Sequence, residues 1–431
     1  MCPPPSLETV VERFWEIDDF PTCAHLSPED EACEAFFKTT HHREPSGRYV
    51  VSLPFHSPKP ILGDSRAHAV RCLEALERRL VKQPGLRTEY QAFMEDYLQS
   101  GHMDVIANPL HDVESAYYLP HHGVIKAEST TTKLRVVFNA SAKTQRDVSL
   151  NDMLMTGPKL QTDVREILLR VRVHKVVFTA DIKQMYRQIM VDKEHQDYQR
   201  IVWRCSPTDP IVDYRLQTVT YGVSSAPYLA IRTLHQLAQD EQCNFPQAAH
   251  VLKSDFYVDD VVTGANSVEE AIALQKELIA LLAAGGFHLR KFASTHSEVL
   301  EWLSSDQLQS PASMSFDKEQ PAVVKVLGVQ WNPSSDCFSY QMTPLNSSST
   351  KRAILSNIAR IFDPLGWLTP ILLYAKSLVQ LLWLTGAGWD EQLPPEVLYS
   401  LPSASCSVLL LTAFGLQTTV VNQRKGVLWD R

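Results

Sequence analysis

Two adjacent carboxylates within an apolar run constrain this chain most. The run is Tyr257-Val258-Asp259-Asp260, with Phe256 before it, Val261 and Val262 after it, and turn-forming residues at 263–266. Placing paired acids beside a buried strand costs free energy unless a cation neutralises them. Mg²⁺ held by one or two carboxylates and substrate phosphates is the commonest enzymatic form of such a site. Taken alone, adjacent acids in a hairpin more often form a solvated turn, so the rest of the chain has to decide.

The size and composition of the chain bound its class. Its 431 residues can form two or three domains, and 44% hydrophobic with 21% charged residues is ordinary for a globular protein. Neither a membrane-spanning run nor a secretory leader is recognisable. The eight cysteines are scattered, which excludes zinc-finger spacing and favours reduced thiols. We therefore expect an intracellular protein, cytoplasmic or nuclear, with no membrane partner.

The net charge of −8 is unevenly distributed along the chain. Residues 1–40 contain nine acids against two bases, whereas residues 121–175 contain ten lysines and arginines against five acids. A basic segment of this kind can follow a phosphate backbone, although a solvated surface would have the same composition. The charge pattern permits nucleic-acid binding without showing it.

Hydrophobic periodicity and turn residues predict an α+β fold. Helices are expected at about 65–100 (two), 161–172, 225–239, 267–284, 351–362 and 370–384. Strands are expected at about 124–125, 134–138, 175–180, 256–262, 323–329 and 337–342. Between 175 and 342 the order suits an antiparallel sheet backed by helices.

Asp181 follows the apolar segment 175–180 directly. If that strand neighbours the one carrying Asp259 and Asp260, three carboxylates meet at one place. Two Mg²⁺ ions roughly 3.5–4 Å apart are the known solution for phosphoryl transfer at such a cluster. Asp181 could instead cap a helix that begins near Lys183, and both interpretations can hold together.

Several motifs resemble a known family when taken in order. Residues 180–189 (ADIKQMYRQI), 221–227 (YGVSSAP) and 257–260 (YVDD) resemble the palm motifs of reverse transcriptases. Further stretches, at 118–122, 133–141, 149–152 and 359–366, resemble the polymerase region of Bel/Pao-type LTR retrotransposons. The resemblance covers roughly residues 6–395.

The resemblance implies a right-hand polymerase with fingers, an antiparallel palm sheet backed by helices, and a partial thumb or connection. It divides the chain into a mainly helical N-terminal segment (1–110), fingers and palm (111–335), the start of a thumb or connection (336–395) and a divergent tail (396–431). The implied activity is RNA-directed DNA synthesis. Its substrates would be an RNA or DNA template, a DNA primer and deoxynucleoside triphosphates, with two Mg²⁺ ions as cofactor and Mn²⁺ able to substitute. The alternative is a catalytically silent retroelement remnant that at most binds nucleic acid.

The resemblance also implies roles for residues of the palm. Asp181 and Asp259 would bind both metals, with Asp260 supporting them. Tyr186 would crowd the sugar 2′ position and reject ribonucleotides, although alone it would be an ordinary core tyrosine. Lys291 falls where these polymerases have a lysine proposed to protonate the leaving pyrophosphate.

Four further residues would contact the nucleotide. Tyr221 and Gly222 match the segment that lies against the incoming nucleotide and the template. Arg135 matches the fingers arginine that contacts the triphosphate, and Lys126 is a second phosphate contact whose alignment needs a small insertion. Without the resemblance, the first two would be a loop before a helix and the other two solvated strand residues.

The sequence also departs from the family. Asn139 stands where the family usually has Asp, outside the metal triad, so we expect at most altered fingers geometry. Past about Leu401 the likeness ends. The chain shows no room for RNase H or integrase, so these missing parts of an element are further candidate partners.

Overall fold

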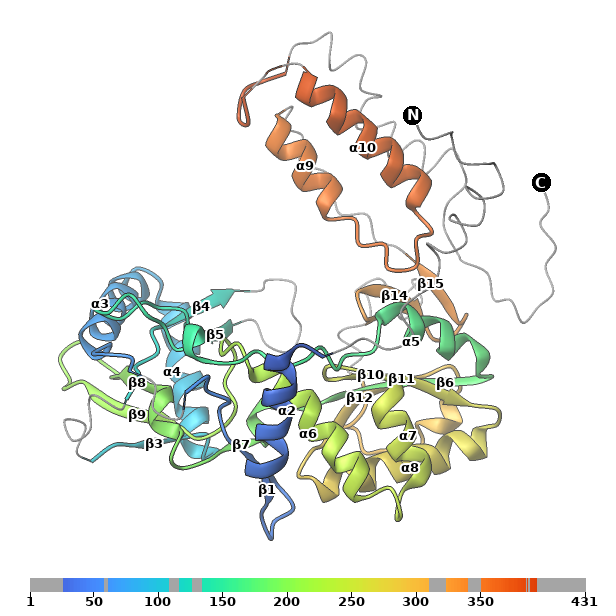
Figure 1. The fold of residues 1–431 in the computed structure, drawn as a ribbon. Coiled ribbons are helices and arrows are strands. Elements are labelled where there is room, and N and C mark those ends of the chain that lie inside the picture. Colours follow the sequence, from blue (N-terminus) through green and yellow to red (C-terminus); the bar gives the residue numbers. More distant parts are fainter. Residues whose placement is uncertain are drawn as a thin grey trace, which may run out of the picture.

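The computed structural model describes residues 26–57, 61–107, 116–125, 134–309, 323–339, 350–384, 386 and 388–393. Lys126 and the expected divergent tail lie outside these residues. Figure 1 shows two neighbouring lobes, with a pair of helices above one of them. The α+β class expected from the sequence is confirmed, as several small sheets with helices.

The palm is a four-stranded antiparallel sheet in the order β10-β11-β6-β12. Its strands are β6 (Val176–Ile182), β10 (Phe256–Tyr257), β11 (Asp260–Ala265) and β12 (Leu289–Ser294). Helices α6 (Ala226–Asp240), α7 (Pro246–Ser254) and α8 (Val268–Ala284) cover one face, as Figure 1 shows. Ser267 caps α8 by accepting the Glu270 N–H, at the start of the helix expected at 267–284.

Alternation along β6 divides its side chains between two hydrophobic cores. Every second residue from Val176 to Ile182 packs into the large core that includes α6, α7 and α8. Val177 packs into a second, smaller core, formed with α5 (Val164–Arg170) and with a small sheet from the C-terminal part of the chain. Because side chains alternate in a strand, Asp181 lies on the same side of the sheet as Val177.

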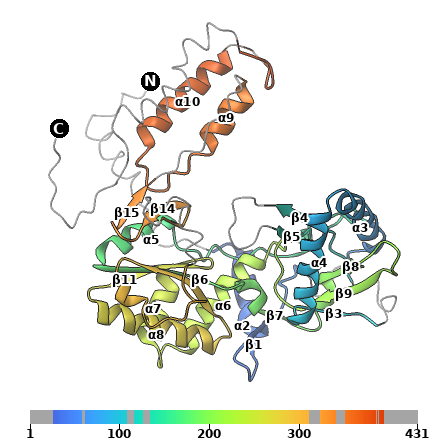
Figure 2. The same ribbon diagram turned by 180° about the vertical axis from the view of Figure 1, so that it is seen from behind.

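The other lobe holds the fingers-like elements. It contains helices α3 (Arg66–Val81) and α4 (Pro84–Gln99), sheet β3-β9-β8 (Met103–Val105, Val212–Leu216, Arg200–Trp203) and hairpin β4-β5 (His121–Ile125, Leu134–Phe138). Figure 2 shows the same lobe from behind, on the far side of α2 and β7 from the palm helices. The large core continues from this lobe into the palm, from Cys33 to Leu303.

The N-terminal elements join the two lobes. Helix α2 (Pro28–Thr40) lies along α6, where Glu34 accepts hydrogen bonds from Tyr228 and Arg232. Strands β1 (His42–Arg43) and β2 (Tyr49–Val51) form a three-stranded sheet with β7 (Met190–Val191). This segment is therefore packed into the fingers and palm, although the sequence had assigned it to a separate N-terminal region.

The C-terminal elements lie beyond the palm sheet. Strands β13 (Val324–Val326), β14 (Val329–Asn332) and β15 (Cys337–Ser339) form a small antiparallel sheet. Helices α9 (Lys351–Ala359) and α10 (Thr369–Leu384) pack against each other and project away from the palm in both views. No helix in the described part of the chain is long and apolar enough to cross a membrane.

Most expected elements are present, but the sequence analysis did not predict α2, β8, β9 or the palm strand β12. The helix expected at 161–172 is shorter, because Asp163 caps α5 and a 3-10 turn (η3, Val171–Val173) follows it. The strand expected to end before Asp181 continues through it to Ile182. Helix α7 was missed, since its nine residues are too few for a clear helical period.

Candidate active site

Asp181 and Asp260 face each other across the centre of the palm sheet. Their Cα atoms are direct partners in the antiparallel pairing of β6 with β11. On β11, Val262 packs into the small core and Val261 into the large one, so Asp260 is on the same side as Asp181. Asp259 precedes β11, and its carbonyl accepts the Ile182 N–H at 2.7 Å. The fold thus brings Asp181 to Asp259 and Asp260, which lie nearly eighty residues later in the chain.

The turn between β10 and β11 has a strained backbone. Tyr257 pairs with Asp260, so Val258 and Asp259 form the tip, and Val258 has φ of +57°. A β-branched residue rarely adopts this left-handed conformation, and such strain, of about 1–3 kcal/mol, persists only where surrounding contacts enforce it. The contacts at this tip come mainly from one side chain.

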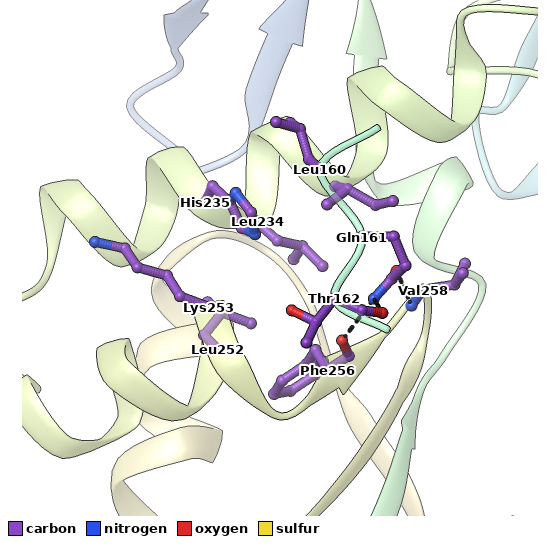
Figure 3. Close-up of a pocket in the computed structure, with 10 residues that line it drawn as sticks. Leu160, Gln161, Thr162, Leu234, His235, Leu252, Lys253, Phe256 and Val258 are labelled. Carbon is purple, nitrogen blue, oxygen red and sulfur yellow. Dashed lines mark hydrogen bonds between the residues drawn. The ribbon is translucent and has the colours of Figure 1, made fainter. Parts of the chain in front are cut away.

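The Gln161 side chain holds the turn through two backbone groups, as Figure 3 shows. Its Oε1 accepts the Val258 N–H at 2.8 Å, and its Nε2 donates to the Phe256 carbonyl at 2.9 Å. A small pocket lies beside this contact, with Leu234 and Lys253 among its lining residues. Gln161 is therefore a positioning residue for the turn that carries Asp259.

The Asp181 carboxylate also accepts hydrogen bonds from two basic side chains. Arg290 Nε donates to one of its oxygens at 2.8 Å, and Lys291 Nζ donates to the other at 2.7 Å. Within the described residues, no group of three or more His, Cys, Asp or Glu side chains is arranged to hold a metal ion. The Asp181 carboxylate is occupied by cations of the protein itself.

The protonation of the other two acids reflects their crowding. Burial, then Asp259 and Asp181, raise the pKa of Asp260 to about 7. Burial and Asp181 also raise the pKa of Asp259, against the opposing fields of Lys291 and Arg135. Carboxylate oxygens are hard ligands, and a cation would relieve this excess of negative charge. The three side chains therefore suit Mg²⁺ in kind, while both oxygens of Asp181 are held by Arg290 and Lys291.

This crowding predicts a pH dependence of stability for the metal-free chain. The Asp260 carboxyl has an ordinary pKa of 3.8 and a folded-state pKa of about 7, so between these values the folded state binds more protons. Asp260 therefore makes the free energy of unfolding fall as pH rises through this window, by up to about 1.4 kcal/mol per pH unit. We expect Asp260→Asn to gain stability relative to the wild type from pH 4 to pH 7 and to keep that advantage above it. Urea unfolding in EDTA at several pH values measures this difference, and parallel pH profiles would contradict it.

Tyr186 and Tyr221 form one aromatic surface near the acids. Their ring centroids are 4.4 Å apart, and Tyr221 is 43% exposed. Burial, with a smaller contribution from Asp259, raises the pKa of Tyr186 to about 12, so its hydroxyl stays neutral. Tyr186 lies in the 3-10 turn η4 (Met185–Gln188), and Arg48 donates to two carbonyls at the end of this turn.

Gly222 lies where only glycine fits. It has φ of +100°, and a Cβ placed on it would lie 2.0 Å from the Phe138 carbonyl oxygen of β5. Asn151 fixes the same loop by donating to the Gly222 carbonyl and accepting the Ser224 N–H. The fingers hairpin and the loop carrying Tyr221 are therefore in direct contact.

The structure brings together most of the residues singled out in the sequence. Arg135 lies on β5 and is exposed. Its positive charge acts to lower the pKa of Asp259. Lys126 is outside the described residues. Asn139, the departure from the family, accepts the Ser141 N–H in the turn after β5.

Sequence reasoning missed Gln161, Arg290 and Arg48. Arg290 stands beside Lys291, and its role could have been suspected if the two strands had been aligned in register. Gln161 and Arg48 act through backbone groups far along the chain, so no local pattern marks them.

Comparisons with known proteins concern the fold of the chain. Two solved structures, of the foamy viral protease-reverse transcriptase in complex with an RNA/DNA hybrid and of its dRH form with double-stranded DNA, match 96% of this chain. Both have TM-scores of 0.51, with 12% and 14% identity. A family profile described as "Pao retrotransposon-like RNaseH-like domain" matches residues 350–409. The chain has a reverse-transcriptase fold and a Pao retrotransposon-like segment.

The chain spans only part of the length of the solved structures that it matches. The chain corresponds to 44% and 62% of the two foamy viral chains, and no curated protein sequence matches it. The resemblance to Pao-type retrotransposon proteins is confirmed, and it rests on the segment that contains α9 and α10. The description of that segment includes an RNase H-like domain, which the sequence analysis had not placed there.

Proposed function

We propose that this Pao-type reverse-transcriptase fold is an RNA-directed DNA polymerase core. The observation that supports the proposal is the pairing of Asp181 with Asp260 on one side of the palm sheet, with Asp259 in the adjoining turn. The Tyr186–Tyr221 pair lies near these acids. Residues 111–335 would form most of the fingers and palm, to which elements within residues 28–105 contribute, and residues 336–395 would begin a thumb or connection. The relatives solved with an RNA/DNA hybrid and with double-stranded DNA support a nucleic-acid duplex as partner.

In this proposal the three acids would hold two Mg²⁺ ions, or Mn²⁺ in their place. Such ions activate the primer 3′ hydroxyl and neutralise the charge that develops on the triphosphate. The protein's own contribution is to position groups: Gln161 fixes the turn under Asp259, and Gly222 fixes the loop under Tyr221. Arg135, with Lys126, would orient the triphosphate, for which a planar guanidinium is well suited. Lys291 would give its ammonium proton to the pyrophosphate oxygen as the phosphorus–oxygen bond breaks.

Primer extension tests the proposal directly. The purified chain, an RNA template, a DNA primer, deoxynucleotides and Mg²⁺ should give extended primer, and EDTA should abolish it. Absence of extension with both Mg²⁺ and Mn²⁺ would contradict the assignment. Salt-dependent duplex binding without extension would identify the alternative, a silent remnant that binds nucleic acid.

Tyr186 provides a prediction about sugar selection. We expect Tyr186→Ala to raise the efficiency of ribonucleotide relative to deoxynucleotide incorporation by about 10- to 100-fold, because the ring would no longer crowd the 2′ position. Tyr186→Phe keeps the ring and should retain wild-type selection. Single-nucleotide insertion kinetics with paired dNTP and rNTP measure the ratio. An unchanged ratio in Tyr186→Ala would remove this tyrosine from sugar selection.

A further inference from the structure

Strand β12 is distorted where it passes Asp181. Arg290 pairs with Asp181 and Ala293 pairs with Thr179, so three steps on β12 correspond to two on β6. The extra residue is a β-bulge, and Lys291 within it has φ of +55°. Both features are unfavourable for a regular strand, and bulges beside active sites commonly redirect a side chain.

The distortion puts two consecutive cations on one carboxylate. In a regular strand, adjacent side chains point to opposite faces, so Arg290 and Lys291 could not both reach the same group. The core contacts show the shift, because Leu289 and Phe292 both pack into the large core, with two residues between them instead of one. As a result Arg290 and Lys291 each hold one oxygen of Asp181, at 2.8 and 2.7 Å.

These contacts leave Asp181 little freedom. Its side chain is 14% exposed, and those of Arg290 and Lys291 are 33% and 29% exposed. Asp259 and Asp260 stand on the other side of Asp181 and repel it. Two positive charges therefore balance a group of three acids that would otherwise be crowded together without a counterion.

We propose that Arg290 and Lys291 are built-in counterions that hold Asp181 when metal is absent and that metal binding must displace. The inference rests on the proposed metal site but concerns a state before any chemistry. A divalent ion at Asp181 would lie within a few ångströms of two cationic groups that donate to the same oxygens, so like charges oppose its entry. Displacement would also release Lys291 toward the leaving group. Arg290 is then a positioning residue that tunes metal affinity.

The sign of the effect on metal affinity separates this role from simple support. If the two cations compete with metal, their removal tightens metal binding; if they only orient Asp181, their removal weakens it. We expect Arg290→Gln and Lys291→Met each to lower the Mn²⁺ dissociation constant by roughly 5- to 100-fold, the usual range for coupled sites. Arg290→Lys, which keeps the charge, and Lys183→Met, which removes an exposed lysine of the turn after β6, should stay near the wild-type value.

The measurement is a Mn²⁺ titration of the full chain without nucleic acid, followed by electron paramagnetic resonance of the free ion. Unchanged or weaker binding in Arg290→Gln and Lys291→Met, or no binding in any form, would overturn the proposal. Because incorporation is not measured, this result is independent of whether the chain extends a primer.

Thermal unfolding in EDTA gives a second readout of the same contact. Arg290→Gln should lower the melting temperature by about 2–4 °C in the wild-type background and by much less in Asp181→Asn, where the charge it balances is gone. An equal decrease in both backgrounds would show that Arg290 acts through other contacts, and would also overturn the proposal.

Discussion

Asp259→Asn should reduce primer extension by at least about 10³-fold, equivalent to about 4 kcal/mol of transition-state stabilisation. The substitution removes one negative charge and one proposed metal ligand from the turn next to Asp181, without changing the size of the side chain. Single-turnover incorporation at saturating Mg²⁺ measures the loss. The same assay with Mn²⁺ should recover only part of it, because an amide oxygen remains a weaker ligand than a carboxylate.

Two controls accompany this experiment: the thermal stability of Asp259→Asn, and the activity of a second variant outside the site. Burial and Asp181 raise the pKa of Asp259, so an uncharged amide at this position removes repulsion and should not lower the melting temperature of the metal-free chain. Glu301→Gln removes an exposed carboxylate outside the site and should keep full activity. Incorporation that survives Asp259→Asn at near wild-type rate would refute the role assigned to this acid.

Gly222→Ala is the second substitution with a large expected effect. The new Cβ would lie 2.0 Å from the Phe138 carbonyl oxygen, and neither backbone atom can move without shifting the loop against β5. A positive φ adds about 1–2 kcal/mol for an alanine, and relieving the overlap adds about 1–3 kcal/mol. We expect a loss of about 3 kcal/mol in the free energy of unfolding, with incorporation reduced by about 100-fold because Tyr221 is displaced.

Gly101→Ala is the matched control. Gly101 also has a positive φ, of +67°, but no atom lies within 4 Å of the position its Cβ would take. It should therefore show only the backbone part of the cost, with activity intact. Chemical denaturation and primer extension of the two variants separate the cost of the positive φ from the cost of the overlap with the Phe138 carbonyl. Equal effects on stability and activity would mean that the approach of Gly222 to Phe138 does not matter.

The sequence predicted the palm strands that carry the acids, although it missed α7 and β12, because the signals of those strands are local. An apolar strand before Asp181, a helix N-cap at Ser267 and an apolar strand after Asp260 each depend on neighbouring residues. The meeting of the three acids followed once these strands were assumed to be neighbours. Antiparallel register and side-chain alternation then placed Asp181 and Asp260 on one face, as the structure shows.

The features that the sequence did not reveal are those set by long-range contacts. The bulge at Lys291 depends on how β12 pairs with β6, and no residue within β12 marks it. The strain at Val258 is maintained by Gln161, which lies nearly one hundred residues earlier in the chain. Packing of α2 against α6 through Glu34 likewise depends on a partner far along the chain.

Metal binding at the three acids is the most direct test of this account. Mn²⁺ should be titrated into the full chain with an annealed primer–template and a non-hydrolysable deoxynucleotide, for the wild type, Asp181→Asn and Asp259→Asn. We predict bound Mn²⁺ in the wild type and at least tenfold weaker binding in each variant. Binding of equal affinity in all three proteins would show that these carboxylates do not form a common metal site.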